Sequence, residues 1–144
     1  MVLHIVTSVA LLGEVWALVA LNIYATVAAD GELAHSAYRL MEVLVFAGGI
    51  PLSMTALIAG VTFALGTHWG LLRHHWIVAK LLLLVAVIVC GMFLFQPAPM
   101  ADATATGTVS ATEQWRQVAV VVFQLVMLVS ATVLSVFKPK GRMR

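Results

Sequence analysis

Four long apolar stretches, separated by shorter polar segments, dominate the pattern of hydrophobic and polar positions along the chain. A helix needs about 20 apolar residues to cross the hydrocarbon core of a bilayer, and strands are much shorter. The pattern therefore predicts an all-α fold: a polytopic membrane protein with a bundle of four transmembrane helices, forming a single integral membrane domain over residues 1–144. The predicted helices cover about residues 3–28, 38–66, 75–96 and 116–137.

The polar segment from Gln96 to Trp115 is the longest connection between the predicted helices. It contains Pro97, Pro99 and Gly107 among many Thr, Ala and Ser residues. Because Pro and Gly interrupt regular structure and small polar residues favour mobile chain, we expect a flexible loop without a function of its own.

The composition agrees with a membrane location. Hydrophobic residues make up 62% of the chain and charged residues 10%, and the mean hydropathy is +1.06. A soluble domain rarely carries so little charge, because its surface must face water. The first apolar stretch lacks a basic leading segment and is longer than a signal-peptide core, so we interpret it as a retained helix. The single Cys90 excludes an internal disulfide and disfavours a cysteine-based metal site.

The distribution of basic residues predicts the orientation in the membrane. Arg73 lies between the second and third predicted helices, whereas the other connections supply only Arg39 and Arg116. Four further basic residues lie in the C-terminal tail, at Lys138, Lys140, Arg142 and Arg144. Because basic residues stay on the cytoplasmic side, we expect a cell-membrane protein with both termini in the cytoplasm. A basic tail beside a span also favours the lipid bilayer over nucleic acid as a partner.

Helical periodicity predicts which faces turn inward. The first predicted helix carries one stripe that holds nearly all its polar residues, and a charge in hydrocarbon costs at least about 2.5 kcal/mol, so this stripe must face the bundle. It consists of His4, Thr7, Leu11, Glu14, Leu18 and Asn22. The second predicted helix, with a kink expected at Pro51, has a matching stripe of mostly small residues that favours close packing. It consists of His35, Glu42, Gly49, Ser53, Ala56, Gly60 and Ala64.

The last two predicted helices carry less specific faces. In the third, one face groups Arg73, Trp76, Lys80, Val87 and Gly91. If that helix is regular, Lys80 points about 140° away from His75, so the two are not expected to share a site. In the fourth, the aligned residues indicate an interhelical hydrogen-bonding face and are Gln117, Gln124, Ala131 and Ser135.

Three residues on these faces are candidates for chemistry. A neutral imidazole at His4 can ligate haem iron or another metal, or it can hydrogen-bond a neighbouring helix. Lys80 lies near the membrane edge, where it can serve a site or reach the surface with Trp76 packed over its stem. Glu14, about 15 Å along the helix from His4, is an intramembrane carboxylate and therefore a functional candidate. Glu14 and Lys80 are the candidate catalytic residues, and the carboxyl is either protonated or paired with a cation such as Lys80.

A second cluster lies where the third helix begins. His68, His74 and His75 fall within eight residues and could bind a metal together with His4, but no carboxylate or thiolate completes a site locally. The alternative is an interfacial belt of Trp, His and Arg at the membrane surface, which is the commoner use of these residues.

Two short segments carry a resemblance to known families. They are Leu3-His4-Ile5-Val6 and Trp76-Ile77-Val78-Ala79-Lys80-Leu81-Leu82. They resemble uncharacterised actinobacterial four-helix membrane proteins, most of all over residues 66–80, and more remotely the HemJ-type protoporphyrinogen oxidases and CopD-like copper-resistance membrane domains. The HemJ resemblance implies b-type haem, with His4 as the haem-binding histidine and Lys80 as the essential lysine.

We therefore expect a haem-binding membrane protein with a redox role, and if it is an enzyme, a membrane oxidoreductase. Haem b would lie between the first and third helices in the cytoplasmic half, with His4 as one axial ligand. The second ligand could be Lys80, one of His68, His74 or His75, or water, and Arg73 is placed to meet the haem propionates. One alternative is a non-catalytic accessory subunit of a larger membrane complex or a homo-oligomer. Another is a small proton-coupled transporter using Glu14 and Glu42, ranked last because no internal repeat or pair of broken helices is visible.

Overall fold

The computed structural model describes residues 2–66 and 74–137, and within these ranges the chain is helical with no strand. Four helical segments are long and apolar enough to cross a membrane, which confirms the predicted number of such helices; each is called a span below. The second and third segments are each interrupted. In chain order the elements are α1 (Val2–Val27), α2 (Gly31–Leu44), η1 (Val45–Gly49), α3 (Ile50–Gly66), α4 (His75–Phe93), α5 (Pro97–Thr106) and α6 (Ala111–Phe137).

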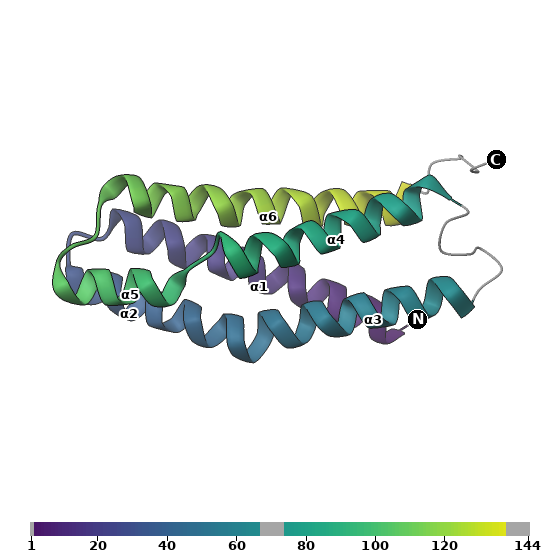
Figure 1. The fold of residues 1–144 in the computed structure, drawn as a ribbon, viewed down its shortest axis with the longest axis horizontal. Helices are drawn as coiled ribbons and strands as arrows, with labels where there is room; N and C mark the ends of the chain where they lie inside the picture. Colours follow the sequence, from purple (N-terminus) through teal and green to yellow (C-terminus); the bar gives the residue numbers. More distant parts are fainter. Residues whose placement is uncertain (1, 67–73, 138–144) are drawn as a thin grey trace.

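The helices form an up-and-down bundle (Figure 1). Each span packs against the next along the chain, and α6 returns to pack against α1. Consequently α1 and α4 lie diagonally across the bundle. We call the end where α1 begins and α6 ends the terminal end, and the opposite end, which carries α5, the α5 end.

Two apolar clusters hold the bundle together. The larger one lies towards the α5 end and the smaller one joins α1, α4 and α6 nearer the middle. The larger cluster includes Leu18, Val19, Tyr38, Met41, Phe95, Met100 and Val121. The smaller consists of Leu11, Val15, Val87, Met127 and Leu128. Burial of such side chains contributes roughly 1.5–3 kcal/mol each relative to an aqueous reference.

The expected flexible loop between the third and fourth spans is wrong, because much of it is the helix α5. Pro97 lies in its first turn, where a missing N–H costs nothing. Gly107 ends it with a left-handed φ of 70°, a conformation that glycine adopts without steric cost. Met100 and Ala101 are buried against α2. Tertiary packing therefore stabilises a segment whose composition favours a loop.

Helix boundaries also differ from the prediction at the α5 end. The second span begins at Gly31 rather than near 38, because the Asp30 carboxylate caps the helix by accepting a hydrogen bond from the Glu32 N–H at 2.9 Å. The last span begins at Ala111 rather than near 116, where the Ser110 hydroxyl accepts from the Glu113 N–H. Polar first turns extend both helices beyond their apolar stretches.

The first interruption is the π-helical turn η1, which bends the second span (Figure 1). Its last hydrogen bond runs from the Ile50 N–H to the Val45 carbonyl, five residues back. Pro51 follows directly, has no N–H to donate, and crowds the carbonyl of Ala47. The predicted kink at Pro51 is therefore present, and a wider turn just before the proline produces it.

The second interruption separates α4 from α5 at residues 94–96. Gln117 of α6, which is fully buried, pairs with the backbone on both sides of this break. Its Oε1 accepts from the Gln96 N–H at 3.0 Å, and its Nε2 donates to the Leu94 carbonyl at 3.3 Å. Freed backbone groups inside a membrane bundle need such partners, since lipid offers none.

Replacing Gln117 with Leu is expected to lower the unfolding temperature in detergent. The change leaves the Gln96 N–H and the Leu94 carbonyl without partners, and each orphaned group costs roughly 1–3 kcal/mol. Ala119→Leu, on the exposed face of the same helix, is the matched control and should leave the transition unchanged. Equal transitions for both variants would show that the bridge does not stabilise the break.

Candidate functional site

The inward stripe predicted for the first span is confirmed. Thr7, Leu11, Leu18 and Asn22 are buried, while His4 and Glu14 are half-buried. The matching stripe of the second span is also turned inward, with Ser53, Ala56 and Ala64 buried. These two faces bring the candidate residues of α1 against η1 and α3.

The Glu14 carboxyl lies directly against the glycine pair of the π-helical turn. A Cβ placed on Gly49 would be 2.8 Å from Glu14 Oε1, and one on Gly48 would be 3.4 Å from its Cδ. A side chain at position 49 would therefore force the Glu14 carboxyl to move, whereas a Cβ at position 48 would make ordinary van der Waals contact with it. The Glu14 side chain occupies the position that any larger residue at 49 would need.

Both Glu14 carboxyl oxygens are buried and have no hydrogen-bond partner among the described residues. The Gly49 backbone interacts with the carboxyl. Lys80, considered from the sequence as its cation, is not its hydrogen-bond partner. A buried polar group without a partner costs about 1–3 kcal/mol, and an unpaired charge costs far more. The carboxyl therefore needs a proton, a water molecule or a cation.

Other buried polar atoms without partners lie along the same side of the bundle. Among the described residues they are His4 Nδ1, both amide atoms of Asn22 and the Tyr38 hydroxyl. His4, Glu14 and Asn22 share one stripe of α1, and Tyr38 extends it on α2. We call these four residues, including Glu14, the polar column. Native proteins pair nearly all buried polar groups, so a line of exceptions needs an explanation.

At the terminal end, His4 packs against α3. A Cβ on Gly60 would lie 3.1 Å from His4 Cε1 and 3.5 Å from Nδ1, and the Ala56 backbone also interacts with the imidazole. Lys80 of α4 is close enough to act on His4 electrostatically. The structure thus brings His4 and Lys80 to one region, although α1 and α4 are not direct neighbours.

Of the remaining predicted ligands, the structure describes His74 and His75. His75 is exposed and His74 packs edge-on to Trp76, whose ring also lies 5.9 Å from Lys80 Nζ. His68 and Arg73 lie outside the described residues. Residues 2–66 and 74–137 contain no group of three or more His, Cys, Asp and Glu side chains placed to hold a metal ion.

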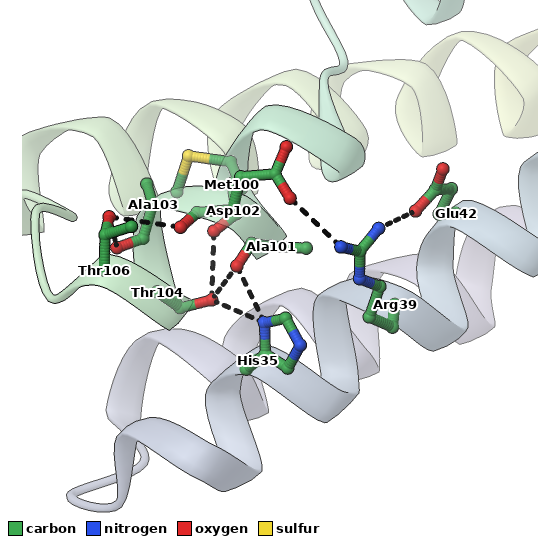
Figure 2. A network of polar contacts seen from close by, with 9 residues as sticks. All are labelled: His35, Arg39, Glu42, Met100, Ala101, Asp102, Ala103, Thr104 and Thr106. Atoms are coloured by element: carbon green, nitrogen blue, oxygen red, sulfur yellow. Dashed lines mark hydrogen bonds and ion pairs between the residues drawn. The ribbon is translucent and has the colours of Figure 1, made fainter.

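At the α5 end, charged and polar side chains of α2 contact residues of α5 (Figure 2). Arg39 Nη1 donates to Glu42 at 3.0 Å, and Nη2 donates to Asp102 of α5 at 3.0 Å. His35 Nδ1 lies 2.7 Å from the Ala101 carbonyl oxygen. Glu42 is therefore held in a structural ion pair, unlike Glu14.

Sequence reasoning missed Tyr38 and Gln114 at this end. Tyr38 is fully buried, and the Gln114 and Thr26 side chains are its polar neighbours. Gln114 itself donates to the Ala25 carbonyl at 3.3 Å. The sequence feature that could have identified Tyr38 is its spacing, three residues after His35 and four before Glu42. This spacing puts Tyr38 near the inward face of the second span.

The close contact between Glu14 and Gly49 can be tested with alanine. Gly49→Ala is expected to destabilise the bundle, because the new methyl group would overlap Glu14 Oε1. Gly13→Ala is the matched control, since its Cβ would meet nothing within 4 Å. The double variant Glu14→Ala/Gly49→Ala should recover most of the loss in a thermal-unfolding cycle. Additive effects of the two changes would contradict the contact.

The candidate site is thus the polar column on α1 and α2, centred on Glu14 and the glycine pair of η1. Comparison of the chain with protein-family models, with curated proteins and with solved structures gives no match.

Proposed function

We propose that the protein is a small proton-coupled membrane carrier in which Glu14 is the group that binds and releases the proton. The observation that carries this proposal is the buried Glu14 carboxyl, packed on the glycine pair of the π-helical turn with no partner among the described residues. An ionisable residue inside a membrane bundle is a functional candidate by default. Its position within α1, well away from both helix ends, suits a group that can be reached from either side in turn.

The two interrupted spans in the fold support a carrier, although the sequence pattern alone indicated no broken helices. Transporters commonly place their binding groups where transmembrane helices are broken, because broken helices can change shape and expose backbone groups. In this chain η1 breaks the second span and residues 94–96 break the third, and the two interrupted spans pack against each other. The pair of broken helices, absent from the sequence pattern, is thus present in the fold.

The distribution of basic residues supports an orientation with both termini in the cytoplasm. In that orientation the terminal end, with His4, faces the cytoplasm, and the α5 end faces outward. A proton from the cytoplasm would pass His4 and bind a Glu14 carboxylate oxygen as a new O–H bond. Its release to water on the other side restores the carboxylate, so each cycle returns Glu14 to its starting state and moves one proton across the bilayer.

Proton flux into proteoliposomes tests the proposal. With a potassium gradient and valinomycin as driving force and a trapped pH dye as readout, Glu14→Gln should reduce flux by about tenfold or more, since it removes the titrating group. Glu42→Gln is the matched control and should keep the flux, because Glu42 pairs with Arg39 near the surface. Flux in Glu14→Gln equal to the wild type would overturn the proposal.

A b-type haem site at the terminal end is the second candidate. Its support is that His4 Nδ1 is buried without a partner and that Lys80 lies nearby, as the HemJ resemblance leads one to expect. The packing does not fit the macrocycle as it stands, since the Nδ1–Cε1 edge of the imidazole contacts the Gly60 position. Haem could reach that nitrogen only if the ring rotated or α1 and α3 moved apart.

Absorption spectra of the purified protein test this second candidate. A Soret band, with sharpened α and β bands after dithionite reduction, should appear in the wild type and vanish in His4→Ala if His4 is a ligand. A colourless preparation that stays colourless after haem addition would remove the haem site. Absence of both colour and proton flux would favour an accessory subunit of a larger complex.

A further inference from the structure

Asn22 and Tyr38 form a second part of the polar column, separate from Glu14. Both side chains are fully buried, at 0% exposure, yet the Asn22 amide nitrogen and oxygen have no hydrogen-bond partner among the described residues. The Tyr38 hydroxyl lies beside the Thr26 and Gln114 side chains but makes no hydrogen bond of good geometry with them. An amide group can donate two and accept two hydrogen bonds, and a phenol can donate and accept. This is therefore the densest unmet hydrogen-bonding capacity in the described part of the chain.

The surroundings of these two side chains are polar on one side. Thr26 lies one turn after Asn22 and donates its hydroxyl hydrogen to the backbone carbonyl of Asn22 at 2.8 Å. The Thr26 hydroxyl oxygen can therefore still accept a hydrogen bond. Tyr38 faces Thr26 and Gln114. Three helices, α1, α2 and α6, thus direct polar groups towards one place near the α5 end.

Water is the ligand that matches these groups. Buried waters in proteins typically make about three hydrogen bonds to polar groups that otherwise lack partners. An ion would need a compensating charge, and the side chains gathered there are amide, hydroxyl and phenol groups. A neutral, hydrogen-bonding ligand that can both donate and accept satisfies all of them.

We infer that Asn22 and Tyr38 bind ordered water inside the bundle, where α1, α2 and α6 meet near the α5 end. This water site does not depend on the proposed function. Asn22 follows Glu14 by about two helical turns, or 12 Å. Leu18, which is buried in the larger apolar cluster, lies between them along α1.

The water site can be observed directly by magic-angle-spinning NMR of the protein in bilayers. Polarisation transfer from water to the Asn22 side-chain amide should be fast. The Gln124 amide is the matched control, because it is buried and already donates to the Val87 carbonyl at 2.9 Å. A water-transfer rate for Asn22 no faster than that for Gln124 would overturn the inference, because the groups would then be dry.

Discussion

Glu14 against the glycine pair of η1 is the contact on which much of the bundle depends. A carboxyl inside an apolar bundle needs room and polar groups nearby, and an opposing backbone without side chains can supply both. Gly48 and Gly49 provide this opening, and the π-helical turn with Pro51 behind it sets the bend that presents them to α1. The direction of the second span, and with it the position of α3 against His4, follows from that bend.

The backbone groups freed at the interruptions of the second and third spans are accommodated in different ways. At residues 94–96 the freed backbone groups are paired by Gln117, so that break is tied to α6. At η1 the backbone makes wider hydrogen bonds and Pro51 removes one donor, with the Glu14 carboxyl lying opposite. The break at residues 94–96 is therefore hydrogen-bonded to the neutral Gln117 amide, whereas η1 faces the Glu14 carboxyl, which can gain or lose a proton.

Periodicity predicted the spans and the inward stripe of α1, because burial in a bundle depends on the angle of each residue around its own helix. It could not predict the pairing of Glu14 with Gly49, which depends on how two helices are rotated and shifted relative to each other. Pro51 indicated a kink but not a π-helical turn. The helix α5 was missed because its two prolines and small residues favour a loop until Met100 and Ala101 are packed against α2. Tyr38 was missed because only its neighbours on the stripe were considered.

The space that Gly49 leaves free is already filled by a side chain from another helix. Positions 14 and 49 therefore share one volume, so neither can be treated as independent during sequence divergence. Where a related chain replaces the glycine by a larger residue, its partner at 14 must shrink or turn away. Covariation between these two positions, 35 residues apart in the sequence, would then mark the helix contact in an alignment, even where neither position is invariant.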